Sequence, residues 1–180
     1  MDAETAGLVS SLREQLDRLT ALVRTLLEMS NLQSVSRTDQ IALAPLVEEI
    51  LTDLTSLAQK NNISLQQDCA ELGMVGSDAL IYRLVFNLVE NGIKYNRPDG
   101  AVRVTLRQEK QTAVLRVADT GPGIPADCRE SIFQPFFRVD KSRSRAEGGS
   151  GIGLALCTRI AQAHGTQLQI DSTEGVGTTV

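Results

Sequence analysis

Apolar residues recur at alternating steps of three and four positions between Glu4 and Asn31. This spacing is typical of one long helix with a heptad stripe along one face. A single helix cannot bury such a stripe alone, so we expect it to belong to a helix bundle; packing on the following domain is the alternative. The stripe consists of Val9, Leu12, Leu16, Leu19, Val23 and Leu26.

Beyond a polar stretch from Gln33 to Thr38, helical and strand-like segments alternate along the chain. Steps of three and four predict helices after Pro45, from Asp78 to about Asn91 and from about Ile152 to Ala163, and Ser77 and Asp78 are suited to cap the second. Period-two spacing predicts strands over Ile63–Gln67, near Met74, over Ala101–Gln108 and Thr112–Asp119, near Leu168 and Ile170, and after Gly177.

This order of elements predicts an α+β fold. We expect a two-layer α/β sandwich, in which three helices cover one face of a mixed sheet, preceded by the long helix. The expected organisation is a helical segment over residues 1–34, a linker over 35–40 and one domain over 41–180.

Composition narrows the class of protein. Hydrophobic residues make up 42% of the chain, charged residues make up 22%, and the net charge is −4, which argues against a general nucleic-acid binder. Three cysteines without a CxxC pair predict reduced thiols inside the cell. No apolar run approaches the ~20 residues that span a bilayer. We therefore expect a cytoplasmic portion of a protein whose remainder is either soluble or anchored in the inner membrane.

Asp119 ends a predicted strand on the same face as Leu115 and Val117. A carboxylate on the apolar face is costly unless it is paired or hydrogen-bonded. Gly121 and Gly123 follow it and allow the backbone to approach a ligand closely. Taken alone, this motif is as typical of a structural turn as of a ligand loop.

Two further clusters have the chemistry of a phosphate site. Asn87, Asn91 and Lys94 follow at steps of four and three, so they share one face of a predicted helix. The glycine-rich run 148–153 opens another helix, and free N–H groups at a helix start bind anions. Each cluster by itself is equally compatible with an exposed amide face or a flexible joint.

In their order and spacing these motifs resemble the nucleotide-binding superfamily shared by gyrases, ninety-kilodalton heat-shock chaperones, histidine kinases and MutL proteins. The resemblance covers about Ile41 to Val180, and it includes a Gly-x-Gly-Thr turn that ends at Thr178. The segment from Ile132 to Arg138 resembles the F box of sensor histidine kinases. The run 150–156 is similar to their G2 box. The residues from Leu12 to Gln33 resemble the second helix of the dimerisation and phosphotransfer hairpin; its first helix, with the phosphoacceptor histidine, has no counterpart in this sequence.

The resemblance implies a Bergerat-type ATP-binding fold and an ATP-dependent protein-histidine kinase that uses ATP or ADP with Mg²⁺. Asp119 would accept a hydrogen bond from the adenine amine, and Asn91 with Asn87 would hold Mg²⁺. Glu90 would act as the base toward the incoming histidine, and Arg138 would offset charge on the γ-phosphoryl group. The other implied nucleotide contacts are Lys94, Tyr95, Gly121, Gly123, Ile124, Phe133, Gly149, Gly151, Ile152, Gly153, Leu154 and Thr178.

The implied partners are the phosphoacceptor hairpin of the same protein, a response-regulator receiver domain and a second copy through the N-terminal helix, in a bacterial cell. His164, the one histidine of the sequence, is expected to be structural. Gly92 stands where the family usually has Ala, and Asn96 stands where it has Ser or Thr.

Other functions weighed are a regulatory module that binds ATP without catalysis, a serine kinase of the anti-sigma-factor type and a dimerisation fragment. A gyrase-like ATPase is disfavoured, because Asn87 replaces the water-activating Glu of that branch.

Overall fold

The computed structural model describes residues 35–139 and 151–180, together with residues 9, 12–13, 15–16, 19–20, 23, 26–27, 30 and 32. A mixed five-stranded sheet has the order β2-β4-β5-β7-β6. Its strands are β2 (Ser64–Cys69), β4 (Ala101–Glu109), β5 (Thr112–Asp119), β6 (Asp171–Thr173) and β7 (Gly177–Thr179). Strands β2 and β4 are parallel, and the other neighbouring strands are antiparallel.

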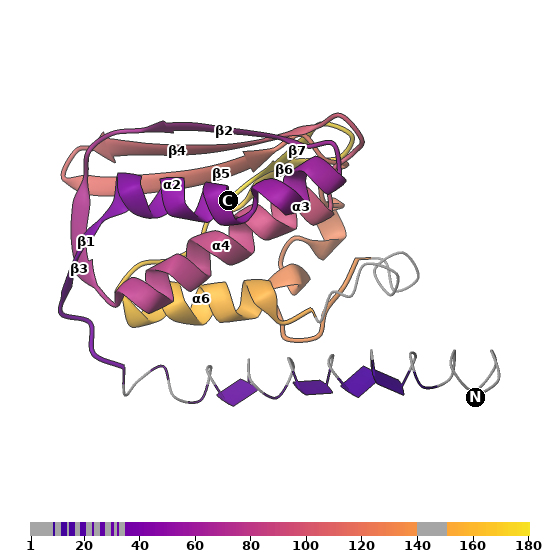
Figure 1. Ribbon diagram of the computed structural model, residues 1–180, viewed down its shortest axis with the longest axis horizontal. Coiled ribbons are helices and arrows are strands. Elements are labelled where there is room, and N and C mark those ends of the chain that lie inside the picture. Colours follow the sequence, from indigo (N-terminus) through magenta and orange to yellow (C-terminus); the bar gives the residue numbers. More distant parts are fainter. Residues whose placement is uncertain are drawn as a thin grey trace.

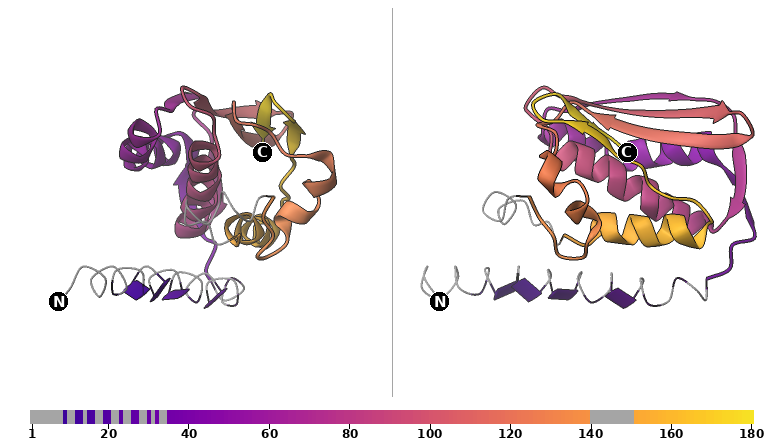
Figure 2. Two further views of the ribbon diagram at one scale, coloured as in Figure 1. Left: turned by 90° about the vertical axis from the view of Figure 1, so that its right-hand side faces the viewer. Right: turned by 180° about the vertical axis from the view of Figure 1, so that it is seen from behind.

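Helices cover one face of this sheet, as Figure 1 and Figure 2 show. They are α2 (Leu43–Asp53), α3 (Thr55–Lys60), α4 (Asp78–Lys94) and α6 (Gly153–Ala163). Helix α3 continues α2 after a break at Leu54, so the helical layer has three rows. The predicted α+β sandwich is confirmed.

The core lies between the sheet and the helices. The inward side chains of β4, Val102, Val104 and Leu106, are fully buried. They pack with apolar side chains of α2 and α4 such as Val47 and Val89. Burial of each such side chain stabilises the fold by about 1.5–3 kcal/mol. The period-two pattern of this strand therefore fixes which face of the sheet carries the helices.

A second, two-stranded sheet was not predicted. Strand β1 (Asp39–Ala42) pairs antiparallel with β3 (Gly73–Gly76) at one end of the helical layer. The Leu43 N–H then donates to the carbonyl of Leu72 at 2.9 Å. Strand β1 thus begins inside the stretch expected to be a linker.

Two local predictions were wrong in position. Helix α2 begins at Leu43, ahead of Pro45, because N–H groups in the first turn of a helix have no partner within the helix and a proline there costs little. The strand expected near Leu168 and Ile170 begins instead at Asp171. Leu168 packs against the core, so its apolar character reflects burial without strand pairing.

His164 joins the end of α6 to the start of α4. Its Nδ1 lies 2.8 Å from the Ile160 carbonyl, and its Nε2 accepts a hydrogen bond from the Ser77 N–H at 3.1 Å. Ser77 is the N-cap residue of α4, but its side chain makes no capping bond. The predicted N-cap position is therefore confirmed, although the Ser77 hydroxyl does not make the cap. The contacts of His164 agree with its expected structural role.

The described residues between Val9 and Ser30 are helical and run beside the domain. The side chains of the heptad stripe are 44–64% exposed. No helix in the described ranges is both long enough and apolar enough to cross a membrane. The three cysteines form no disulfide.

Candidate nucleotide site

Two asparagines of α4 face the first residue of α6. Asn87 is buried and Asn91 is half-buried. A Cβ atom built on Gly153 would lie 4.0 Å from Asn87 Oδ1 and 3.9 Å from Asn91 Nδ2. A side chain at position 153 would therefore occupy the space next to both amides. The structure brings this predicted pair together with the second glycine of the Gly-x-Gly motif.

The start of α6 suits an anion. The helix has 11 residues, its N-cap residue Ile152 makes no side-chain capping bond, and its first turn contains no acidic residue. Unpaired N–H groups and the positive end of the helix dipole favour negative charge at such a position. Ile152 is fully buried and Leu154 packs against the core, which anchors the helix start.

Asp119 lies at the end of β5, opposite Val102 of β4 and Thr178 of β7. Its Oδ1 accepts hydrogen bonds from the Gly121 N–H at 2.8 Å and the Thr178 N–H at 3.3 Å. Burial raises the pKa of the Asp119 carboxyl above its ordinary value, and these two N–H groups partly offset the rise. The second oxygen, Oδ2, makes no hydrogen bond within the described part of the chain, so it can accept one from a ligand.

Helix α4 passes close behind this carboxylate. A Cβ atom on Gly92 would lie 3.6 Å from Asp119 Cβ and 3.1 Å from Val102 Cγ2. Asp119 and Asn91 are thereby held on adjacent elements with little space between the backbones. Gly92 therefore allows α4 to pack directly against the strands that carry Asp119 and Val102.

Ser172, which sequence reasoning missed, ties the loop after Asp119 to the β6–β7 hairpin. Its buried hydroxyl accepts from the Ile124 N–H at 2.8 Å and lies 2.9 Å from Thr178 Oγ1. Gly123 has φ +73 and passes so close to β6 that a Cβ atom would lie 2.2 Å from the Thr173 carbonyl oxygen. Loop and hairpin therefore support Asp119 as a unit.

The segment from Ile132 to Arg138, which contains three phenylalanines, contacts the glycine-rich loop at Gly151. The Phe136 N–H donates to the Gly151 carbonyl at 2.8 Å, and Phe136 itself has φ +68 and an exposed side chain. Phe133 lies in a short 3₁₀ helix, Ser131–Phe133. Gly149 lies outside the described residues, so its predicted phosphate contact remains a prediction.

Two of the predicted site residues contain buried side-chain nitrogen atoms without a hydrogen-bond partner among the described residues. They are Nδ2 of Asn87, and Nε with one terminal nitrogen of Arg138. Buried donors are normally hydrogen-bonded, and leaving one unpaired costs about 1–3 kcal/mol. Phosphate oxygens can accept hydrogen bonds from such donors, and amide oxygens such as those of Asn87 and Asn91 are ligands suited to Mg²⁺. The residues present therefore fit a nucleotide with Mg²⁺.

Glu90 and Lys94 form an ion pair with each other. Lys94 Nζ lies 2.8 Å from Glu90 Oε1, and both side chains are partly exposed. Pairs four residues apart on a helix contribute only about 0.3–0.5 kcal/mol. Either side chain can therefore exchange its partner for a substrate group at small cost. Tyr95, the C-cap residue of α4, is 43% exposed beside them.

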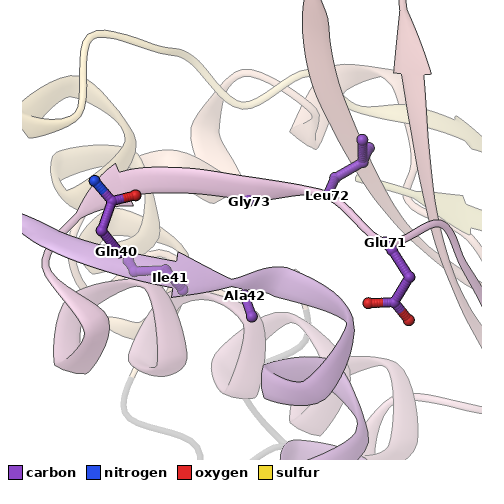
Figure 3. A pocket seen from close by; sticks show the side chains of 6 residues that line it. All are labelled: Gln40, Ile41, Ala42, Glu71, Leu72 and Gly73. Atoms are coloured by element: carbon purple, nitrogen blue, oxygen red, sulfur yellow. The ribbon is translucent and has the colours of Figure 1, made fainter.

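A separate pocket of about 360 Å³ lies between β1 and β3 (Figure 3). Gln40, Ile41, Ala42, Glu71, Leu72 and Gly73 line it. None of these is a predicted site residue, and the pocket includes no glycine-rich loop.

Residues 76–180 match the family described as histidine kinase-, DNA gyrase B-, and HSP90-like ATPase. The chain belongs to this family. Within the family it is placed among the sensor histidine kinases. Sensor histidine kinase RppB of Synechocystis sp. is 35% identical over 179 residues, which are 97% of this chain and 39% of RppB. Sensor-like histidine kinase SenX3 of Mycolicibacterium smegmatis is 34% identical over 167 residues, 90% of this chain and 43% of SenX3. The chain thus spans less than half the length of these relatives.

Solved structures share the fold. The mycobacterial sensor histidine kinase MprB is 26% identical with a TM-score of 0.69, over 79% of this chain and 93% of that one. Full-length ShkA in complex with AMPPNP is 24% identical with a TM-score of 0.80, over 99% of this chain and 38% of that one. ThkA in complex with the response regulator TrrA is 24% identical with a TM-score of 0.76, over 99% of this chain and 51% of that one. At their identity, the last two establish the fold alone.

Proposed function

We propose that this chain is the ATP-binding catalytic part of a sensor histidine kinase, which transfers the γ-phosphoryl group of ATP to a histidine for relay to a response-regulator aspartate. The observation that carries the proposal is the geometry at Asp119. Backbone N–H groups of Gly121 and Thr178 hold one carboxylate oxygen in place. The other oxygen can accept a hydrogen bond from the adenine amine.

The phosphate end of the nucleotide would lie between α4 and the start of α6. Asn91 and Asn87 would hold Mg²⁺ through their amide oxygens, since this ion keeps waters and needs few protein ligands. The bound ion would neutralise charge on the phosphate oxygens. The N–H groups at Gly153 and the buried guanidinium of Arg138 would then face the same phosphates.

Glu90 and Lys94 are proposed to act at the reacting end. Lys94 would leave the ion pair for a phosphate oxygen, and the released Glu90 carboxylate would take the proton from the attacking histidine nitrogen. Further nucleotide contacts are proposed for Tyr95, Gly121, Gly123, Ile124, Phe133, Gly149, Gly151, Ile152, Leu154 and Thr178.

The N-terminal stripe supports a proposed helix bundle. Leu12 is 62% exposed and Leu16 is 64% exposed, although both are apolar. Burying such a stripe requires other helices, and a second copy of the chain would supply one. We propose residues 1–34 as the second helix of the phosphotransfer hairpin, 35–40 as a linker and 41–180 as the catalytic domain. The histidine-bearing first helix would complete the hairpin.

A receiver domain is the proposed partner for onward transfer, supported by the ThkA structure that contains a response regulator. The matched relatives RppB and SenX3 come from bacteria. We therefore propose a bacterial protein whose catalytic part works in the cytoplasm.

Calorimetric titration with AMPPNP tests the proposal. We expect saturable binding of one nucleotide per chain, with higher affinity in the presence of Mg²⁺ than in EDTA. GMPPNP is the matched control, because its base lacks the adenine amine. Absence of AMPPNP binding by folded protein, or equal binding of both nucleotides, would contradict the proposed site.

A further inference from the structure

Asn96 follows the C-cap of α4, and all its amide hydrogen-bonding positions are in use. Its Nδ2 donates to the Gly92 carbonyl at 2.8 Å and to the Ala101 carbonyl at 3.1 Å. Its Oδ1 accepts from the Arg97 N–H at 2.9 Å and from the Thr120 hydroxyl at 3.3 Å. An amide offers two donors and two acceptors at most, so this side chain is fully committed.

The four bonds join the end of α4, the start of β4 and the segment that follows β5. Gly92 belongs to the last turns of α4, and Ala101 begins β4. Thr120 follows Asp119, and its hydroxyl also accepts from the Ala101 N–H at 2.9 Å. Asn96 therefore links Gly92, which follows Asn91, to Thr120, which follows Asp119.

The surrounding backbone is shaped around this amide. A Cβ atom on Gly100 would lie 2.2 Å from Asn96 Oδ1. A Cβ atom on Gly121 would lie 2.9 Å from the Tyr95 carbonyl oxygen and 3.4 Å from Asn96 Cα. Gly100 thus makes room for the Asn96 amide, and Gly121 makes room for the backbone of Tyr95 and Asn96. Gly92 and Asn96, the two departures from the usual family residues, are also bonded to each other.

We propose that Asn96 is a positioning residue that fixes the spacing between Asp119 and Asn91. This inference rests on the proposed function, in which Asp119 binds adenine and Asn91 binds the metal-phosphate end. A ligand that spans both ends, such as ADP with Mg²⁺, depends on that spacing. Adenosine engages only the Asp119 end and depends on it much less.

The test compares ADP·Mg²⁺ and adenosine affinities of Asn96→Ala with those of the unchanged chain. Calorimetry is suited to ADP, and amide chemical shifts are suited to the weaker adenosine. Loss of three partly buried hydrogen bonds predicts ADP·Mg²⁺ binding about tenfold weaker, with adenosine affinity changed by less than about threefold. Asn96→Thr supplies a hydroxyl that can donate to the carbonyl four residues earlier. Its ADP affinity should therefore lie between that of Asn96→Ala and that of the unchanged chain.

Asn61→Ala is the matched control. The Asn61 Nδ2 also donates to the carbonyl four residues earlier, Leu57, at 2.8 Å, but at the end of α3. It should leave both affinities unchanged. Gly100→Ala, which displaces the Asn96 amide without removing it, should reproduce the Asn96→Ala pattern and serves if that variant does not fold.

The possible results distinguish failure of the inference on Asn96 from failure of the proposed function. An equal loss for ADP and adenosine would assign Asn96 a general structural role and overturn the inference. Unchanged ADP affinity in Asn96→Ala would overturn it as well, while leaving the proposed function intact. If the unchanged chain bound neither ligand, the proposed function would fail first, and the inference would fail with it.

Discussion

Replacement of Asp119 by asparagine isolates the acceptor on which adenine recognition depends. The two side chains have nearly the same shape, so the change leaves no cavity. An asparagine Oδ1 can still accept from the N–H groups of Gly121 and Thr178. The atom that faces the ligand changes from an acceptor oxygen to a donor NH₂ group, which meets the donor NH₂ of adenine.

The expected loss follows from two contributions. A hydrogen bond to a charged group contributes about 1.5–3 kcal/mol, and an unpaired buried donor costs about 1–3 kcal/mol more. Since 1.4 kcal/mol corresponds to a factor of ten, ADP affinity should fall by about 10²- to 10⁴-fold. Binding should therefore disappear at concentrations that saturate the unchanged chain.

The fold should survive this change. The raised pKa of Asp119 means that folding disfavours the ionised carboxyl relative to the unfolded chain. A neutral asparagine removes that cost near neutral pH, so the nucleotide-free variant should melt no lower than the unchanged chain.

Calorimetry with ADP and thermal unfolding without ligand measure the two effects separately. Asp171→Asn makes the same change of charge at an exposed position of β6 and should alter neither value. A folded Asp119→Asn variant with unchanged ADP affinity would refute the assignment of this carboxylate to adenine.

Four further predictions concern the metal, pH, stability and phosphorylation. Asn91→Ala should remove most of the gain in AMPPNP affinity that Mg²⁺ provides, because an amide ligand of the ion is lost. Titration with Mg²⁺ and with EDTA measures this gain, and an equal gain in the variant and the unchanged chain would exclude Asn91 as a ligand. ADP affinity should weaken on acidification at a higher pH than expected for an ordinary aspartate, because the pKa of Asp119 is raised and its carboxylate takes up a proton at higher pH. The same protonation stabilises the nucleotide-free fold, since a group whose pKa is raised in the folded state adds stability as the pH falls through that pKa. Calorimetry over a falling series of pH values measures the affinity, with Asp119→Asn as the control for titration of ADP itself. Identical pH profiles for the variant and the unchanged chain would contradict this. His164→Ala should lower the free energy of unfolding in urea by about 1–3 kcal/mol, because the Ser77 N–H loses its acceptor; an unchanged midpoint would show that this contact contributes nothing. Incubation with γ-labelled ATP should leave this chain without acid-labile label, because phosphoryl transfer needs a nucleophile held in line and His164 is bound on both ring nitrogens to the backbone; label on His164 would contradict that reasoning.

The local spacing of apolar and polar residues was sufficient to predict the helices and strands that carry the candidate site. The period-two spacing that buries Val117 also places Asp119 toward the helices, and the β4–β5 hairpin follows from two adjacent alternating segments. Helical spacing likewise placed Asn87 and Asn91 on one side of α4. These features depend on residues close together in the sequence, where the geometry of a single element decides the result.

Contacts between distant segments were beyond reach of the same reasoning. Ser172 meets Ile124 across a separation of 48 residues, and a serine in a short polar segment gives no sign of burial. Strand β1 has only four residues, too few for a period to be distinguished, and its pairing with the predicted strand near Met74 joins distant segments. Helical spacing placed Lys94 on the face of Asn87 and Asn91, but it did not predict the ion pair that Lys94 forms with Glu90.

Amide chemical shifts recorded during a titration with ADP and Mg²⁺ test the central claim most directly, because they report where the nucleotide binds. We expect saturable shifts at Gly121 and Thr178, which adjoin Asp119, and at Gly153, at the start of α6. We expect little change at residues of the pocket between β1 and β3, such as Ile41. Saturable shifts confined to the pocket between β1 and β3, or no saturable shift at all, would contradict it.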